Sequence, residues 1–135
     1  MRFRRRRLPD DLAPAFDAFR RVLDEVEPAK ADLTDVVPGS RLPGRPVDDA
    51  LRGFVARLAR AEALMPSWRR QELAPVWSAC ADGLAAARAD ASSILDEGRE
   101  PAGFGDLLGI VEGILDRLES FAEAEARFEE LRRRG

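Results

Sequence analysis

The stretch VDDALRGFVARLARAEALM (residues 47–65) carries the clearest information about the fold of this chain. Its apolar residues recur at alternating intervals of four and three, a spacing that places them on one face of an α-helix. They are Val47, Leu51, Phe54, Leu58, Ala61 and Met65. Asp48 and Asp49 stand where carboxylates favour the helix dipole, and Pro66 follows the last position. We therefore predict a helix over residues 47–65 with one buried face.

The same spacing appears on both sides of this stretch. Upstream, it predicts a helix over residues 10–27 that Pro28 ends, with the apolar positions Leu12, Phe16, Phe19, Leu23 and Val26. Downstream, it predicts a third helix from about Ser67 to Gly98, in which Pro75 marks either a kink or the true start. A fourth and longest helix is predicted over residues 104–134, with the apolar positions Phe104, Leu107, Val111, Ile114, Leu118 and Phe121.

The connections between these segments predict how they pack. Short connections on either side of the third helix favour antiparallel neighbours. Residues 28–46 are rich in proline and glycine, so we expect a linker, long enough for the first two helices to lie parallel or antiparallel. The predicted fold is all-α: a four-helix bundle with a long antiparallel C-terminal hairpin and a Pro/Gly-rich linker between helices one and two. We expect a single helical domain over residues 10–134, preceded by a basic flexible N-terminal arm over residues 1–9.

Composition limits the chemistry that this domain can perform. With 135 residues, of which 45% are hydrophobic, the chain can form one core without a metal or a disulfide. Because it has no histidine, sites and triads that depend on imidazole are excluded, and we expect no metal and no cofactor. Cys80 is the single cysteine, which fits the cytoplasm. Lys30 is the one lysine among 22 basic residues, a bias that indicates GC-rich bacterial coding.

Charge is unevenly distributed along the chain. The formal net charge is −3, yet one short arm carries five arginines: Arg2, Arg4, Arg5, Arg6 and Arg7. We consider three roles for this arm: a solvated tail, a contact with anionic lipid or nucleic acid, or docking onto an acidic stripe of its own body. The stripe consists of Glu112, Asp116, Glu119, Glu123 and Glu130. Leu8-Pro9-Asp10-Asp11 follows the arm in place of an apolar run, so we expect no export signal, and no transmembrane segment.

Small residues suggest a second contact surface. Gly105, Gly109 and Gly113 lie four apart on the fourth helix, away from its apolar face. Folding of the hairpin brings them level with Ala85, Ala89 and Ser92 of the third helix. Small residues let another helix approach closely, so these six residues are candidates for self-association or for a groove that binds a partner helix. The alternative is a solvated face produced by Ala/Gly-rich composition.

The two tryptophans and Cys80 lie in or just before the third helix. Trp77 and Cys80 fall on its apolar face, so we expect both in the core, with Cys80 acting as a small hydrophobe and not as a nucleophile. Trp68, with Arg69 and Arg70 beside it, either caps the end of the bundle or anchors a protein partner.

No spacing in the sequence forces ionisable groups together in a cleft, so we expect no catalysis. The favoured function is a cytoplasmic helical module for protein–protein interaction, an adaptor whose partner is another protein or a second copy in a homodimer. One alternative is a bundle that binds a small molecule or lipid among Phe16, Phe19, Phe54 and Trp77. Another is an adaptor at a membrane surface that uses the arginine arm, with no specific binding of nucleic acid.

Overall fold

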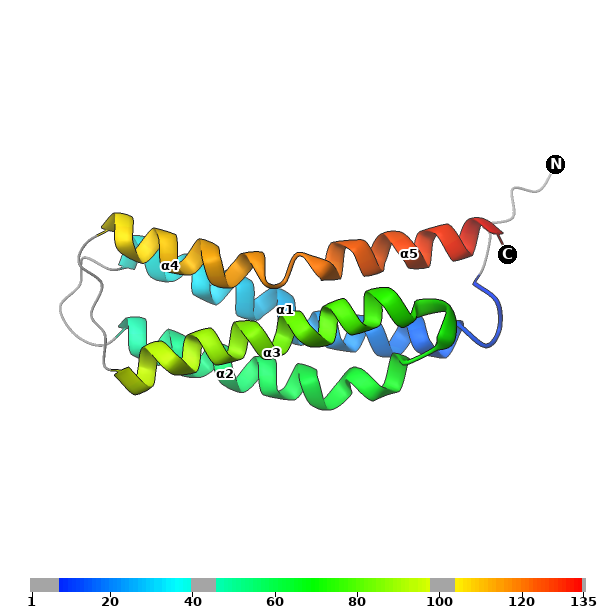
Figure 1. Cartoon of the computed structure of the whole chain (residues 1–135), viewed down its shortest axis with the longest axis horizontal. Coiled ribbons are helices and arrows are strands. Elements are labelled where there is room, and N and C mark those ends of the chain that lie inside the picture. Colours follow the sequence, from blue (N-terminus) through cyan, green and yellow to red (C-terminus); the bar gives the residue numbers. More distant parts are fainter. Residues whose placement is uncertain (1–7, 40–45, 98–103, 135) are drawn as a thin grey trace.

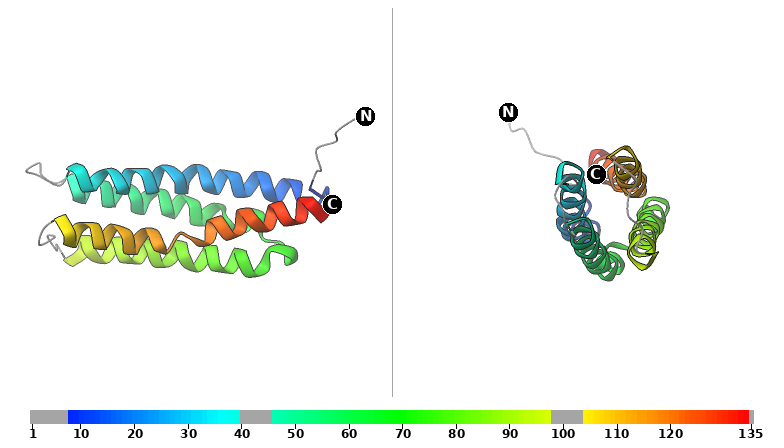
Figure 2. Two further views of the ribbon diagram at one scale, coloured as in Figure 1. Left: turned by 90° about the horizontal axis from the view of Figure 1, so that it is seen from above. Right: turned by 90° about the vertical axis from the view of Figure 1, so that its left-hand side faces the viewer.

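The structure, a computed structural model, describes residues 8–39, 46–97 and 104–134. The long helices in these ranges are α1 (Ala13–Gly39), α2 (Pro46–Leu64), α3 (Ala74–Glu97), α4 (Phe104–Asp116) and α5 (Ser120–Arg134). They run alternately in opposite directions along the bundle, with α4 and α5 forming its fourth segment (Figure 1). Viewed end-on, the four segments surround one interior (Figure 2). The described residues contain no strand, so the prediction of an all-α four-helix bundle is confirmed.

Helix α1 is longer than the sequence pattern predicted. It continues through Pro28 to Gly39, so the expected end at residue 27 was wrong, and residues 28–39 are helical where a linker was predicted. A proline inside a helix removes one backbone hydrogen bond and costs about 3 kcal/mol. Burial of Ala29 and Leu33, which continue the four-and-three spacing beyond Pro28, offsets this cost. The structure also settles the direction of α2, which runs antiparallel to α1 (Figure 1).

The corner between α2 and α3 consists of two short 3-10 helices. They are η1 (Met65–Trp68) and η2 (Gln71–Leu73), and α3 begins directly after them. Pro75 therefore lies in the first turn of α3, where its missing N–H has no intrahelical partner to lose. Of the two possibilities considered for Pro75, the true start of the helix is correct.

In α2 and α3 the core consists of the apolar faces that the spacing predicted, whereas in α1 Phe16 and Leu23 are only half-buried and Ala15, Ala18 and Val22 are buried in addition. In α2 the buried residues are Leu51, Phe54, Leu58 and Ala61, and in α3 they are Cys80, Leu84, Ala87 and Ala91. Aromatic side chains gather toward one end of this core. The ring of Phe19 lies 4.9 Å from that of Trp68 and 5.1 Å from that of Phe128, and Phe16 meets Phe128 edge-on at 5.2 Å. Toward the other end the buried residues are aliphatic, among them Leu33, Leu51, Ala91 and Val111.

The predicted fourth helix is interrupted. Residues 117–119 form a turn between α4 and α5, so the prediction of a single longest helix over 104–134 was wrong. At the turn, the backbone N–H groups of Arg117, Leu118 and Glu119 each donate to the carbonyl three residues earlier, at 3.1, 2.9 and 3.3 Å. These bonds satisfy the carbonyl groups that the end of α4 would otherwise leave unpaired.

Gly83 of α3 explains how the turn is accommodated. A Cβ atom at residue 83 would lie 2.2 Å from the backbone oxygen of Arg117, so only glycine fits this contact. Before the turn, α4 packs against both α1 and α3. Beyond it, α5 packs against α3, and its Phe128 meets Phe16 and Phe19 of α1. An open recess lies between α3 and α4.

Candidate interaction surface

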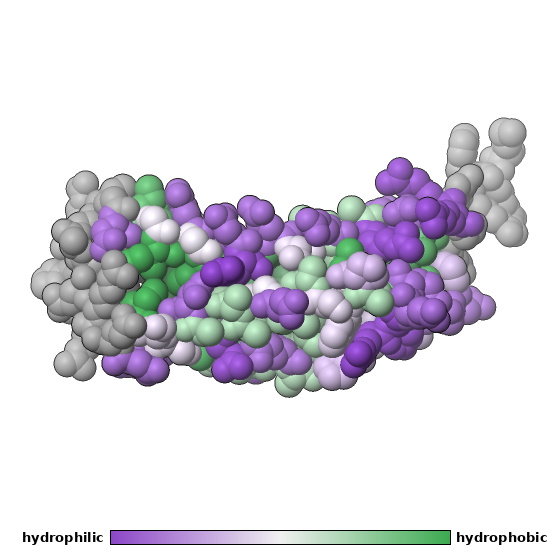
Figure 3. All heavy atoms as spheres, viewed as in Figure 1, coloured by the Kyte–Doolittle hydropathy of each residue, from purple (hydrophilic) through white to green (hydrophobic). Residues whose placement is uncertain are grey.

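The recess between α3 and α4 has a volume of about 630 Å³ and opens directly to solvent. Its apolar lining consists of Ile94 from α3 and Ile110 and Ile114 from α4, of which Ile94 and Ile110 are half-buried. Figure 3 shows hydrophobic surface between α3 and α4, toward the end at which α3 terminates. Side chains at this position can therefore contact a further group without unfolding the bundle.

Polar groups border the recess on the side nearest the turn. The Nε atom of Arg117 donates to the Oδ2 atom of Asp90 at 3.2 Å, and this pair joins the α4–α5 turn to α3. Both side chains are about half exposed, at 54% and 40%, so the pair contributes at most about 1 kcal/mol to stability. Asp116 and Ser93 complete the border. The recess thus combines an apolar floor with a charged edge that remains in contact with water.

Glycines of α4 lie beside this recess. Gly113 lines it, and a Cβ atom at Gly109 or Gly113 would meet no heavy atom within 4 Å. Both glycines are exposed, so neither is required for a contact within the bundle. Gly105 is also helical, but its surroundings fall outside what the structure describes. The backbone of α4 is consequently open to close approach from outside.

The matching small-residue face of α3 lies elsewhere. Ala85 and Ala89 are exposed and Ser92 is half-buried, yet none of them lines the recess. The α3 residues that share the recess with Gly113 are Asp90, Ser93 and Ile94. The structure therefore does not bring the two predicted small-residue faces together there. Ile110 was missed because it is not one of the regularly spaced apolar positions of the predicted fourth helix. Its place near Gly109 and Gly113, which lie away from the apolar face, could have indicated it.

Of the two tryptophans, Trp77 is less buried than predicted, and Trp68 agrees with the capping alternative and not with the exposed anchor. Trp68 is fully buried, and its Nε1–H points to the sulfur of Met65 at 3.2 Å, so it cannot act as an exposed anchor for a partner. Trp77 is only half-buried, and its Nε1–H donates to the carbonyl of Met65 at 2.8 Å. The error arose because the corner η1–η2 interrupts the helical register that was extended from α3 back to Ser67.

Arg69 and Arg70 lie at this same corner. The guanidinium of Arg69 lies over the ring of Trp77, 4.7 Å from its centroid, and Arg70 donates to the carbonyl of Arg69 at 2.9 Å. Neither arginine has a carboxylate within 4 Å among the described residues. Both guanidinium groups thus contact other parts of this corner, one through an aromatic ring and one through a backbone carbonyl.

Cys80 lies in the core, as predicted for a small hydrophobe. Burial and, to a smaller extent, the negative charge of Glu123 together raise the pKa of its thiol to about 12. A thiolate is the nucleophilic form of cysteine, so this environment suppresses reactivity.

The acidic residues of the fourth segment do not form a metal site in the part of the chain that the structure describes. Glu112, Asp116, Glu119 and Glu123 are exposed, and Glu130 pairs with Arg127 and Arg134. No group of three or more metal-ligating side chains occurs among these or the other described residues. The stripe is divided between α4 and α5 by the turn at 117–119.

Other ion pairs link neighbouring helices across the outside of the bundle. Glu25 of α1 pairs with Arg57 and Arg60 of α2, at 3.7 and 3.1 Å. Arg88 of α3 holds Glu62 of α2 with two hydrogen bonds of 2.8 and 3.1 Å, which raise the pKa of Arg88. These pairs lie at helix–helix boundaries and tie one helix to the next.

The arginine arm, with Arg2, Arg4, Arg5, Arg6 and Arg7, lies outside the described residues. The two residues that follow it belong to the body. Leu8 is buried, and the carbonyl of Pro9 accepts the N–H groups of Leu12 and Ala13 at 2.8 and 3.2 Å. The start of the bundle is thus fixed directly after Arg7.

The four residues proposed to surround a small ligand are packed among other side chains. Phe19 and Phe54 are fully buried, and Phe16 packs against Phe128. Trp77 belongs to the surface of the α2–α3 corner and lies 6.5 Å from Trp68, measured between ring centroids. The structure therefore does not gather Phe16, Phe19, Phe54 and Trp77 around one opening.

Comparison of the chain with protein-family models, with curated proteins and with solved structures finds no significant match. Within the described ranges, none of the helices combines the length and the apolar character needed to cross a membrane.

Proposed function

We propose that this protein is a non-catalytic helical interaction module that binds a helix of another protein, or of a second copy of itself, along α3 and α4. The observation that carries the proposal is the recess beside Gly113, where Ile94 and Ile110 present apolar surface and the backbone of α4 is uncovered. An incoming helix could place apolar side chains against the isoleucines while its backbone passes close to the glycines.

The position of the charged side chains also supports this role. Several carboxylate–arginine pairs of the described residues lie at the boundaries between helices, where they orient one helix against the next. Such an arrangement produces a rigid platform for binding. We place this platform in the cytoplasm, where the unpaired thiol of Cys80 is stable.

The experiment compares Gly113→Leu with Gly53→Leu. Both glycines are helical and exposed, and a Cβ at either would meet nothing within 4 Å, so both variants should fold equally well. Only Gly113→Leu places a side chain in the recess. For self-association, sedimentation velocity over a wide concentration range should show assembly of the wild type and of Gly53→Leu, and weaker assembly of Gly113→Leu.

For a different protein partner, a photo-crosslinking amino acid at residue 113 should capture a defined protein in cells, while the same group at residue 53 should not. The proposal is overturned if the wild type stays monomeric at every concentration and residue 113 captures no more than residue 53. It is equally overturned if Gly53→Leu weakens assembly as much as Gly113→Leu.

A further inference from the structure

The surface around the recess carries a net negative charge. Four exposed carboxylates stand on the elements that meet at the α4–α5 turn, and we call them the acidic border. They are Asp82 of α3, Asp116 of α4, Glu119 of the turn and Glu123 of α5. Figure 3 shows hydrophilic residues next to the hydrophobic surface of the recess, toward the middle of the bundle.

Contacts place the members of the acidic border beside the recess. Asp116 lines it. Asp82 directly precedes Gly83, the glycine that meets the backbone of the turn, and Glu119 is the last residue of that turn. The pKa of the buried thiol of α3 is raised by burial and, to a smaller extent, by the charge of Glu123, so this carboxylate lies near α3. The border therefore follows the boundary between α3 and the fourth segment.

Basic side chains of the described residues leave the acidic border unneutralised. No lysine or arginine of these residues lies within 4 Å of its four carboxylates. Arg117 is occupied by Asp90, at 3.2 Å. Arg88 of α3 pairs with α2, and Arg127 pairs with a carboxylate of its own helix. Since the Asp90–Arg117 pair is neutral, the four carboxylates of the border give this surface a local charge of −4.

On the basis of the function proposed above, we infer that the helix bound along α3 and α4 comes from a different protein and is basic, with lysines or arginines beside an apolar stripe. Its apolar side chains pack on Ile94 and Ile110, and its basic side chains lie against Asp82 and Asp116. A helix of about 13 residues, roughly 20 Å long, matches the length of α4. Charge complementarity speeds the encounter and orients the helix before the apolar contacts form.

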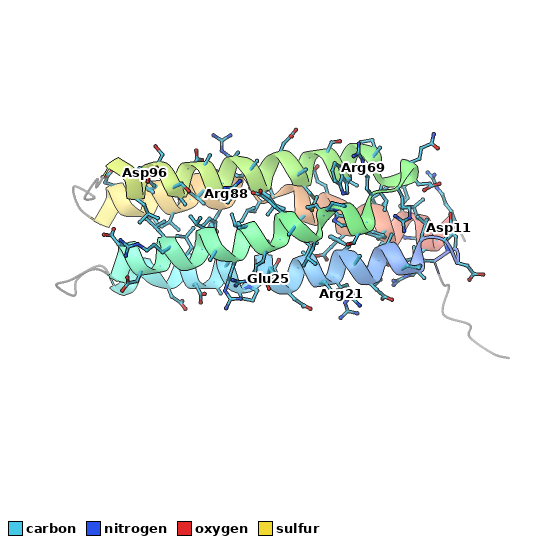
Figure 4. All side chains as sticks on the ribbon, turned by 90° about the horizontal axis from the view of Figure 1, so that it is seen from below. Asp11, Arg21, Glu25, Arg69, Arg88 and Asp96 are labelled. Carbon is cyan, nitrogen blue, oxygen red and sulfur yellow. The ribbon has the colours of Figure 1, made fainter. Side chains whose placement is uncertain are left out.

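A second copy of this chain fits the surface less well. A two-fold dimer through the recess would bring two acidic borders together, and like charges across an interface oppose association. Figure 4 shows Asp96 at the end of the bundle toward which the recess lies, and the basic residue Arg69 toward the other end. A contact between the recess of one copy and the arginines at the far end of another would be head-to-tail, so it would produce open chains and not a closed dimer.

The experiment uses two synthetic helical peptides with leucines at the same positions, one carrying lysine and the other glutamate at the remaining positions. Each peptide is labelled with fluorescein, and its binding to the full chain is followed by fluorescence anisotropy at low and high salt. We expect the lysine peptide to bind at least about tenfold more tightly than the glutamate peptide, with an affinity that falls as salt is added.

Variants of the full chain locate the binding. Gly113→Leu fills the recess, so it should weaken binding of the lysine peptide about tenfold, whereas Gly53→Leu should not weaken it. Asp116→Asn and Asp82→Asn should each weaken it about threefold, because each removes one exposed charge pair. Asp24→Asn removes an exposed carboxylate of α1 outside the recess and should leave the affinity unchanged. Thermal melts check that each variant is folded.

The outcomes distinguish this proposal from the proposed function. If both peptides bind equally and Gly113→Leu weakens both, the recess binds helices without selecting basic ones; the proposed function then stands and the choice of partner is wrong. Assembly of the wild type through residue 113 has the same meaning. The proposal is also overturned if neither peptide binds, or if Gly113→Leu binds the lysine peptide like the wild type. Equal losses for Asp24→Asn and Asp116→Asn overturn it as well, because the attraction would then not be confined to the acidic border.

Discussion

Replacement of Gly83 by alanine tests whether the α4–α5 turn determines the packing of α3. The new Cβ would lie 2.2 Å from the carbonyl oxygen of Arg117, so the two backbones must separate by roughly 1 Å to restore an ordinary contact. A backbone oxygen cannot rotate away as a side chain can. Overpacking of this kind costs about 3 kcal/mol, whereas alanine in place of glycine in a helix gains about 1 kcal/mol. We expect Gly83→Ala to lower the free energy of unfolding by about 2 kcal/mol.

The matched control for this variant is Gly53→Ala. Gly53 is also helical, and its Cβ would meet nothing within 4 Å, so only the gain in helix propensity remains. We expect this control to raise the free energy of unfolding by about 1 kcal/mol. Urea denaturation followed by tryptophan fluorescence measures both variants. If Gly83→Ala is as stable as Gly53→Ala, the contact between Gly83 and Arg117 does not constrain the bundle, and the explanation of the turn given above is wrong.

Three further predictions concern the core and its boundary. Trp68→Ala should lower the free energy of unfolding by about 4 kcal/mol in urea denaturation, because it empties a fully buried site; a smaller loss than that of Trp77→Ala would contradict this. The folded-state pKa of Cys80 is raised to about 12, above its value in the unfolded chain, so its contribution to stability is complete below about pH 9 and is lost as the pH rises toward 12. Cys80→Ala should flatten this part of a stability–pH curve, and an unchanged slope would show that other groups cause it. For Arg88 and Glu62, a double-mutant cycle measured by chemical denaturation should give a coupling free energy of about 0.5–1 kcal/mol. A coupling of zero would show that the pair orients α2 and α3 without adding to the free energy of unfolding.

The sequence predicts the helices well because the burial of apolar side chains at helical spacing dominates the energetics of this chain. Leu51, Phe54 and Leu58 lie in the core where their spacing placed them. Pro28 shows the limit of predictions from local sequence. The free-energy cost of a proline within a helix can be predicted from the sequence alone, but the compensating burial of Leu33 depends on the position of α2. Local propensity and tertiary packing therefore gave opposite indications at this residue.

The candidate surface was less predictable than the fold. The interruption at residues 117–119 contains no proline or glycine, and the residue that accommodates it, Gly83, lies on another helix. The recess is lined by residues of both α3 and α4, so its lining could not be derived from α4 alone. Gly109 and Gly113 were identified because glycine is costly in a helix, and the structure shows that no contact within the described bundle requires them.

The separation of side-chain types along the core has a consequence for local unfolding. Phe19, Trp68 and Phe128 interlock at one end, whereas the other end relies on smaller aliphatic and alanine side chains. Free energies of opening should therefore form a gradient, so that amide protons near Ala91 and Val111 exchange with solvent before those near Phe19 and Phe128. A binding partner that enters between α3 and α4 would meet the half of the molecule that opens most readily, and slower hydrogen exchange there would report its arrival.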